Sequence, residues 1–347
     1  MLSKDRRPVM NSFKNSSQYY HMVLSKMIPQ AEPAFQVADE QIRVWGKQWG
    51  VKNDVGKIRT ILVHRPGNEL KVITKDKYDE CLEALIDTEN QWYFRSDKEP
   101  DIVLMQKEHD ELTRILKAEG IDVIYTDGSQ RDPDAINVRD NGIVINGGVI
   151  ITRMGIVGKQ HGTGRRGEEA YVTRTLANIG MPILHTIHGA GIMEGGSFCL
   201  LDSNHAAIGL SYRGNVCAAE QIRHVLAIQN IELVEIPLTG FSLHLDSAIV
   251  MVDYDKALVN VEKLPYWFLD YLKKLNIKPI FTDYRDGAIG INCLAISPGR
   301  VLTYDDAPWT AERLAKENIE VIPLNYKECR KKGGGIHCGT LPLIREE

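Results

Sequence analysis

Residues 142–153 read GIVINGGVIITR, two short apolar runs separated by Asn-Gly-Gly. Runs rich in Ile and Val on either side of Asn and Gly are typical of a β-hairpin. The stretch 166–180, RGEEAYVTRTLANIG, follows with a helical pattern that ends at Gly, and the apolar run 182–186, PILHT, comes next. We therefore interpret residues 142–186 as a β-β-α-β unit.

The same unit recurs along the chain. Further hairpin patterns cover residues 197–213, 246–261 and 292–304, and each is followed by a helical pattern (218–230, 264–276, 307–318) and one short strand (232–238, 278–282, 320–324). An earlier copy has a hairpin at 58–73, a helix at 102–120 and a strand at 122–126.

The hairpins that begin at residues 142, 197, 246 and 292 lie roughly 46 to 55 residues apart, a period near that of propellers, solenoids and repeat arrays. Five units predict a five-bladed α/β propeller of ββαβ repeats, with helices outside, as one domain over residues 47–347. A generic α/β sheet is the alternative, because alternation of helices and strands alone does not exclude it.

The C-terminal stretch GGGIHCGTLPLIREE, residues 333–347, contains the next repeat position. Its apolar residues predict a lone strand whose natural partner is the first strand of the chain, at 58–65. Pairing of these two strands would close the ring. Residues 1–46 do not fit the repeat, and we expect an N-terminal extension that packs on the ring or on another subunit, which leaves a homo-oligomer open.

The composition is that of an ordinary soluble globular protein, with 43% hydrophobic residues, 25% charged residues and a net charge of −4. No basic excess calls for nucleic acid or an anionic membrane, and no segment approaches the ~20 apolar residues of a spanning helix. The N-terminal stretch lacks the apolar run of a signal peptide. We therefore expect a cytoplasmic protein with neither nucleic acid nor membrane as partner.

The six cysteines are scattered without a CxxC pair, which favours reduced thiols over a disulfide framework. The His and Cys residues also lack the spacing of zinc ligands, and HExxH does not occur. The sequence therefore predicts neither a metal nor another cofactor.

Five polar residues share one repeat position, at or just before the first strand of each hairpin: Asp140, Glu194, His244, Asp246 and Cys338. Equivalent positions in a ring of repeats face one axis, where buried carboxylates are costly unless they are paired. A cysteine with a histidine supplies a nucleophile and an acid/base. Carboxylates beside a thiol raise its pKa unless the substrate brings positive charge, and a guanidinium fits that need.

Each of these residues also has a structural interpretation. Cys338 alone is more often a small buried hydrophobe, Asp140 could be a turn residue, and His244 could be a capping or core histidine. The shared repeat position favours the functional interpretation, because the structural ones do not predict it. His337 neighbours Cys338 on a strand and so points to the opposite face, which indicates a structural role.

Four motifs in this order resemble those of the guanidine-modifying enzymes: R-D at 139–140, E-G-G at 194–196, H-x-D at 244–246 and G-G-x-x-C at 334–338. That family includes arginine deiminases, agmatine deiminases, dimethylarginine hydrolases and amidinotransferases, and its members are five-bladed α/β propellers. The resemblance runs from about Val51 to the end of the chain. Each motif is short, and their order and spacing together carry the resemblance.

The resemblance implies a role for each residue. Cys338 would attack the guanidinium carbon, and His244 would protonate the leaving ammonia and then activate water to hydrolyse the thiouronium intermediate. Asp140 and Asp246 would hold the guanidinium, and Glu194 would bind it or orient His244.

Further residues are predicted to bind the substrate. The resemblance carries over two arginines that bind a substrate carboxylate, Arg213 in GLSYRGN and Arg165 in GTGRRGEE; a solvated surface arginine is the alternative for either. Asn292, at the shared repeat position of its hairpin, is expected to contact the substrate as well. The glycine-rich loop at 155–167 lacks the GxxxxGK[ST] order of a phosphate cradle, and a mobile lid over the substrate fits it better.

The motifs divide between members of the family. H-x-D favours deiminases and amidinotransferases, E-G-G favours hydrolases, and GGGIHCGT resembles bacterial amidinotransferases. Ser197 stands where deiminases usually carry an aspartate, while Arg213 favours a substrate with a carboxylate. We predict hydrolysis of arginine or a close guanidino-acid analogue, releasing ammonia and a ureido product. The alternatives are an amidinotransferase and a non-catalytic binding module on the same fold.

Overall fold

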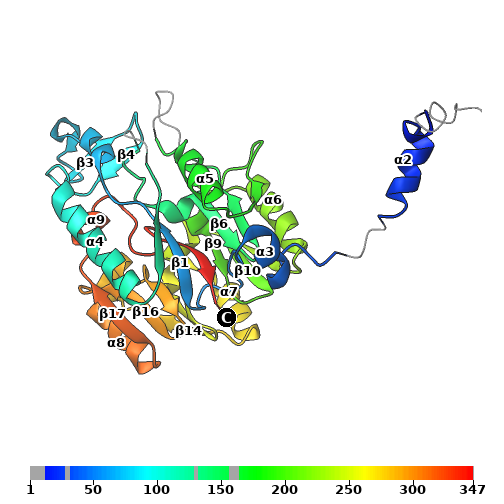
Figure 1. Cartoon of the computed structure of the whole chain (residues 1–347). Coiled ribbons are helices and arrows are strands. Elements are labelled where there is room, and N and C mark those ends of the chain that lie inside the picture. Colours follow the sequence, from blue (N-terminus) through cyan, green and yellow to red (C-terminus); the bar gives the residue numbers. More distant parts are fainter. Residues whose placement is uncertain (1–11, 28–31, 129–131, 156–163, 347) are drawn as a thin grey trace, which may run out of the picture.

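The computed structural model describes residues 12–27, 32–128, 132–155 and 164–346. Its strands form six three-stranded sheets, and five of them are built alike, with a central strand that pairs antiparallel on one side and parallel on the other (Figure 1). Among the described residues no helix is long and apolar enough to cross a membrane.

Four of these sheets follow the chain order predicted from the repeat. Their strands are β6 (Gly142–Ile145), β7 (Gly148–Ile151) and β8 (Ile183–Thr186); β9 (Phe198–Leu200), β10 (His205–Leu210) and β11 (Glu232–Pro237); β12 (Ile249–Asp253), β13 (Lys256–Val259) and β14 (Lys278–Phe281); β15 (Leu294–Ser297), β16 (Arg300–Tyr304) and β17 (Glu320–Leu324). The first two strands of each sheet form the antiparallel hairpin, and the third pairs parallel with the second. The predicted β-β-α-β unit is confirmed in all four.

A helix connects the second and third strands of each unit. The helices are α5 (Glu168–Asn178), α6 (Val216–Ala227), α7 (Tyr266–Lys274) and α8 (Pro308–Lys316). After three of them the chain turns at Asn230, Asn276 and Asn318, whose φ angles are 58°, 59° and 61°. Asn is one of the few residues that tolerates this left-handed conformation, which ends a helix and redirects the chain toward the sheet.

The fifth sheet joins the first strand of the described residues to the last. Its central strand β1 (Ile58–Val63) pairs antiparallel with β18 (Leu341–Arg345) and parallel with β5 (Asp122–Tyr125), which follows helix α4 (Ile102–Ala118). The predicted pairing of the C-terminal strand with the first strand is confirmed. Burial of Leu341 and Leu343 explains why this end of the chain is apolar.

The hairpin predicted at residues 58–73 is wrong. Its second half forms the short 3-10 helices η1 (Asn68–Val72) and η2 (Lys75–Lys77), because the antiparallel partner of β1 is β18. The sixth sheet, β2 (Tyr78–Asp79), β3 (Ala84–Asp87) and β4 (Trp92–Phe94), is an insertion that the repeat does not predict.

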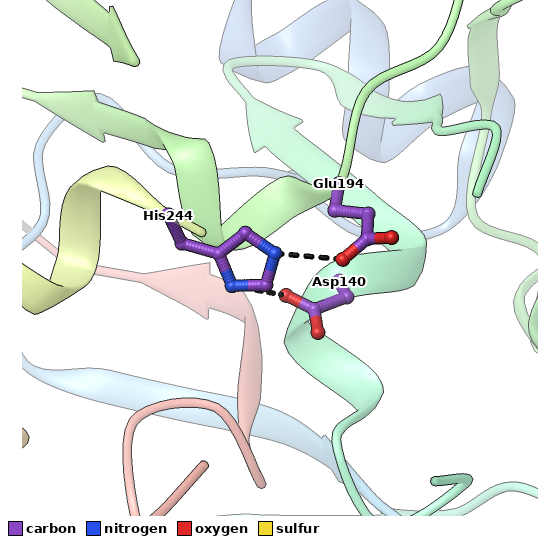
Figure 2. A group of neighbouring side chains, drawn as sticks. All are labelled: Asp140, Glu194 and His244. Carbon is purple, nitrogen blue, oxygen red and sulfur yellow. Dashed lines mark hydrogen bonds and ion pairs between the residues drawn. The ribbon is translucent and has the colours of Figure 1, made fainter. Parts of the chain in front are cut away.

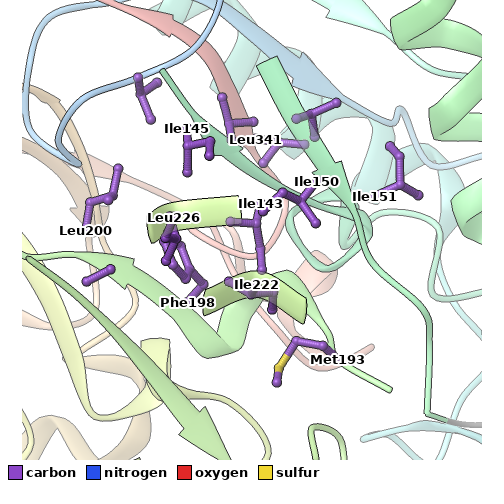
Figure 3. Packing of buried hydrophobic residues seen from close by; sticks show 14 of the residues in the cluster. Ile143, Ile145, Ile150, Ile151, Met193, Phe198, Leu200, Ile222, Leu226 and Leu341 are labelled. Carbon is purple, nitrogen blue, oxygen red and sulfur yellow. The ribbon is translucent and has the colours of Figure 1, made fainter. Parts of the chain in front are cut away.

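The buried apolar side chains form three clusters between the sheets and the helices. Figure 3 shows one of them, where Ile143 and Ile145 lie near Leu341 of the C-terminal strand, and Ile222 and Leu226 of α6 lie near Phe198. Such packing fixes each strand, and with it the turn that precedes the strand.

The N-terminal segment has little contact with this core. Helix α2 (Ser17–Leu24) has no buried residue and lies away from the sheets, while α3 (Ala38–Trp45) buries only Gln41 (Figure 1). Phe35 and Gln36 approach the β6–β7 turn at Gly147. The division into residues 1–46 and 47–347 stays a prediction.

Candidate active site

The predicted site residues lie in tight turns that precede or follow the strands. Asp140 is in η3 (Val138–Asn141), Glu194 directly precedes η4 (Gly195–Ser197), and Asp246 is in η5 (Leu245–Ser247). These 3-10 turns lead into β6, β9 and β12, and η4 contacts both of the others. Cys338 lies in the corresponding turn before β18.

His244 lies between two carboxylates (Figure 2). Its Nε2 is 2.7 Å from an Oε of Glu194, and its Nδ1 is 3.5 Å from an Oδ of Asp140. Burial alone lowers the pKa of a histidine, but here the two carboxylates outweigh it and raise the pKa of His244 to about 9. The imidazole is therefore protonated at neutral pH.

Two arginines neutralise the carboxylates around His244. Nη1 of Arg165 lies 2.6 Å from Asp140 and 3.4 Å from Glu194, and Nη1 of Arg213 lies 2.9 Å from Glu194. Both arginines are buried, so the surface alternative for either is excluded. Burial raises the pKa of the Glu194 carboxyl, but Arg165, His244 and Arg213 together hold it far below its usual range.

Glu168 holds Arg165 at Nε and Nη2, the nitrogens that do not face Asp140 and Glu194. Its two carboxylate oxygens accept hydrogen bonds from Nε and Nη2 of Arg165 at 3.0 and 2.9 Å. Despite this bidentate pair, burial raises the pKa of Glu168 to about 7. Arg165 thus pairs with three carboxylates, one of which, Asp140, was predicted to hold the substrate guanidinium. The predicted contact of Arg165 with a substrate carboxylate stays a prediction.

The surroundings of Cys338 are mostly neutral hydrogen-bonding groups. Nδ2 of Asn292 lies 3.2 Å from the Cys338 sulfur, and the Asn292 carbonyl oxygen accepts from the hydroxyl of Tyr304 at 3.1 Å and the backbone N–H of His337 at 2.9 Å. The Tyr304 hydroxyl in turn accepts from the backbone N–H of Ile336 at 2.9 Å. A side chain at Gly335 would collide with that hydroxyl, so the close approach requires glycine here.

Asp246 brings a carboxylate to the same thiol. One of its oxygens lies 3.4 Å from the Cys338 sulfur and 2.9 Å from Nδ1 of His337. Burial, together with the charges of Asp246 and Asp140, raises the pKa of Cys338 well above its usual value. The strand predicted at His337 and Cys338 is wrong, because both residues lie in the turn before β18. His337 holds Asp246 through its Nδ1, and burial lowers the pKa of His337.

Five of these residues line one cavity of about 270 Å³: Asp140, Arg165, Arg213, His244 and Cys338. Asp246 and Asn292 line a neighbouring cavity that also reaches Cys338. The first cavity also holds an ion pair that the sequence did not predict: Nζ of Lys332 lies 2.6 Å from Asp134. The Lys332 side chain is wholly buried, and desolvation lowers its pKa although Asp134 opposes the shift. The only sequence signal was a basic pair before the glycine run, KKGGGIHC.

Other predicted features lie at the edge of this site or beyond it. Ser197 is fully buried and its hydroxyl has no hydrogen-bond partner among the described residues, so its small polar group does not replace the carboxylate that deiminases usually carry there. The lid predicted at 155–167 falls largely on residues 156–163, which lie outside the described residues.

Asp140, Glu194 and His244 are also a group whose ligand atoms lie within 4.8 Å of one another, close enough for a metal ion. Both carboxylates already pair with buried guanidinium groups. The two arginines supply the positive charge that a cation would bring, so the donor set fits ion pairing better than metal coordination.

Two family profiles match the chain. The profile described as eukaryotic N,N dimethylarginine dimethylhydrolase matches residues 83–268, more than half of the chain, and the arginine deiminase profile matches residues 282–345. The chain belongs to the guanidine-modifying enzyme superfamily. Its four motifs therefore come from relatedness within this superfamily.

Curated relatives extend this match over most of the chain. An arginine deiminase from Oenococcus oeni is 22% identical, covering 86% of this chain and 97% of its own length. One from Listeria monocytogenes is 24% identical, covering 85% and 97%.

Solved structures show the same fold. The Pseudomonas aeruginosa dimethylarginine hydrolase with citrulline bound superposes with a TM-score of 0.65 at 21% identity, covering 83% of this chain and all of that one. An amidinotransferase of saxitoxin biosynthesis from Microseira wollei gives a TM-score of 0.67 at 17% identity, covering 86% and 97%. At this identity the likeness concerns the mixed α/β fold of the superfamily.

Proposed function

We propose that this member of the guanidine-modifying superfamily is a cysteine-dependent guanidine hydrolase acting on arginine or a close guanidino-acid analogue. The observation that carries the proposal is that Cys338, His244 and Asp140 border one cavity from equivalent turns of the repeat. The two matched profiles are named for amidine hydrolases and support the same reaction class. We further propose that the five like sheets form the blades of a closed ring, with residues 47–347 as one catalytic domain.

In the first half of the reaction, the Cys338 sulfur attacks the guanidinium carbon. The raised pKa of the Cys338 thiol makes it a poor nucleophile until the substrate guanidinium brings positive charge beside Asp246 and Asp140, when the thiol proton passes to water. The C–N bond then breaks, and protonated His244 gives its proton to the departing nitrogen, which leaves as ammonia. The substrate remains bound to Cys338 as an S-alkylthiouronium.

In the second half, the neutral imidazole of His244 takes a proton from water, whose oxygen attacks the same carbon. The C–S bond breaks, the electron pair returns to the Cys338 sulfur, the second proton of the water passes to that sulfur, and a ureido product forms. Glu194 holds the imidazole in position for both transfers through the contact at Nε2. One histidine thus serves as acid and then as base.

The substrate's tail is proposed to lie in the cavity with its carboxylate toward Arg213. This guanidinium uses Nη1 for Glu194, and its buried Nε has no acceptor among the described residues. Binding of a substrate guanidinium at Asp140 requires Arg165 to share or release that carboxylate, to which it is already bonded. Asn292 is proposed to keep the thiol aimed at the guanidinium carbon through its contact with the sulfur.

Amidino transfer is the second candidate, because the GGGIHCGT ending resembles bacterial amidinotransferases and one such enzyme shares the fold. Incubation of the protein with arginine, with and without glycine as amine acceptor, separates the two. Citrulline and ammonia without acceptor support the hydrolase, whereas ornithine formed only with acceptor supports the transferase. Inertness toward a panel of guanidino compounds that vary in chain length, carboxylate and N-substitution contradicts both.

A further inference from the structure

A second cavity, of about 260 Å³, reaches the same thiol. It shares six lining residues with the first cavity: Tyr93, Leu243, His244, Gly333, Gly334 and Cys338. The two cavities therefore both border the proposed nucleophile and the proposed acid/base.

The rest of the two linings comes from different parts of the fold. The first cavity continues over Asp140, Arg165 and Arg213, which belong to the units of β6–β8 and β9–β11. The second continues over Asn292 and Tyr304, in the unit of β15–β17. Tyr93, from the inserted sheet, packs so closely on Gly333 that a side chain there would collide with its hydroxyl. Tyr93 and the glycine run thus lie between the two spaces.

The two cavities also differ in charge. The first is lined by three carboxylates, Asp87, Asp134 and Asp140, and by three cations, Lys332, Arg165 and Arg213. The second is lined by Arg95, Lys263 and Arg330, with Asp246 as its one carboxylate among the described residues.

The cations of the second cavity have few acidic partners. Asp246 is already engaged by His337, and Arg330 gives Nη2 to Asp306 at 2.6 Å while its buried Nε and Nη1 have no acceptor among the described residues. A cavity with excess positive charge repels guanidinium and ammonium ions. Only at Asp246, beside the Cys338 sulfur, does it meet the substrate guanidinium, and the rest of the second cavity does not compete with the first for the substrate.

The proposed reaction needs such a second access. When the S-alkylthiouronium has formed, the substrate's tail fills the first cavity, and ammonia must leave and water must enter beside His244. We propose that the second cavity is the port through which ammonia leaves and hydrolytic water reaches the Cys338 adduct. This inference rests on the proposed function. In the step that it serves, the water oxygen bonds to the thiouronium carbon, its proton passes to His244, and the C–S bond breaks.

Two exposed residues allow a matched test. Ala288 lines only the second cavity and Thr88 lines only the first. We expect Ala288→Trp to lower kcat for citrulline about tenfold and to let a covalent adduct, with the mass of arginine minus ammonia, accumulate in intact-protein mass spectra of acid-quenched samples. Thr88→Trp is expected to raise KM for arginine about fivefold with little change in kcat and no adduct. Ala288→Leu should give an intermediate effect.

The results of these experiments test the port and the proposed hydrolase function separately. Wild-type kcat without adduct in Ala288→Trp, alongside the expected KM effect in Thr88→Trp, overturns the port and leaves the hydrolase standing. A second outcome also overturns the port. If the wild type forms guanidinoacetate from added glycine, and Ala288→Trp loses this product but still forms citrulline, the second cavity binds the acceptor amine. Wild-type protein that forms neither citrulline nor adduct overturns the proposed function itself.

Discussion

The two sides of the Cys338 site are held together by different forces. On one side the carboxylates of Asp140, Glu168 and Glu194 surround Arg165 at 2.6 to 3.4 Å, all of them buried. On the other side Asn292 and Tyr304 reach the thiol through neutral hydrogen bonds. The first side consists of buried ion pairs, and the second side orients the thiol of Cys338.

Substitutions on the two sides of the site are expected to have different effects on stability and activity. Removal of one partner from a buried ion-pair network leaves an uncompensated charge and costs about 3–5 kcal/mol, whereas loss of a neutral hydrogen bond costs about 1 kcal/mol. Changes on the charged side should therefore reduce stability as much as activity, and changes on the neutral side should act mainly on the reaction.

The largest effect is expected for Cys338→Ser, which removes the nucleophile and keeps its volume. Turnover of arginine should fall by about a thousandfold or more, with little change in the urea midpoint. The matched control is Cys217→Ser at an exposed cysteine, which should leave turnover unchanged. A Cys338→Ser variant with wild-type turnover would refute the assignment of the nucleophile.

The next effect tests the charged side directly. Arg165→Met leaves Asp140 and Glu168 without their guanidinium, and the free energy of unfolding at neutral pH should fall by about 3–5 kcal/mol. Adding Asp140→Asn removes a stranded carboxylate, so the double variant should recover part of the loss, measured by urea denaturation. A double variant no more stable than Arg165→Met would contradict an uncompensated carboxylate as the source of the loss.

The sequence predicted the fold well where the pattern was local. Hairpin, helix and parallel strand recur within each unit, and asparagines end three of the helices in a conformation that few other residues tolerate. The hairpin predicted at residues 58–73 failed because Pro-Gly-Asn after β1 resembles a hairpin turn. The antiparallel partner of β1 is β18, near the C-terminus. The short strands β2–β4 have no equivalent in the other units.

The site residues, like the fold, could be predicted where they follow the repeat. Asp140, Glu194, Asp246 and Cys338 were predicted together because they share a repeat position, and they lie in corresponding turns. Asp134 and Lys332 were missed because they lie in connecting segments with no equivalent in other units, and only tertiary packing places them at the cavity. Glu168 was missed because it begins helix α5, where the repeat pattern gives no sign of its contact with Arg165. A sequence repeat thus predicts the positions that its units share. The ion pairs at the cavity depend on residues that differ between units, and the repeat does not predict them.

A third prediction concerns the pH dependence of the charged side. The pKa of His244 is about 9 in the folded protein, above its usual 6.5, so the stabilisation it gains is complete below pH 6.5 and is lost as the pH rises through 9. The shift corresponds to roughly 3 kcal/mol. The difference in unfolding free energy between the wild type and His244→Gln should shrink by about this amount from pH 6 to pH 10, and a difference that stays constant would contradict the protonated imidazole.

The smallest effect is expected on the neutral side, for Tyr304→Phe. The variant keeps the buried ring but leaves the Ile336 N–H and the Asn292 carbonyl oxygen without the hydroxyl they share, which should cost about 1–2 kcal/mol of stability. Because Asn292 still contacts the thiol and the His337 backbone, kcat should fall only a few fold with KM for arginine unchanged. Tyr326→Phe is the control, since the buried Tyr326 hydroxyl interacts with Cys329 and not with Asn292 or the thiol, and its removal should leave kcat intact. A loss of kcat as deep as that of Cys338→Ser would show that the neutral side takes part in the chemistry as well as in aiming the thiol.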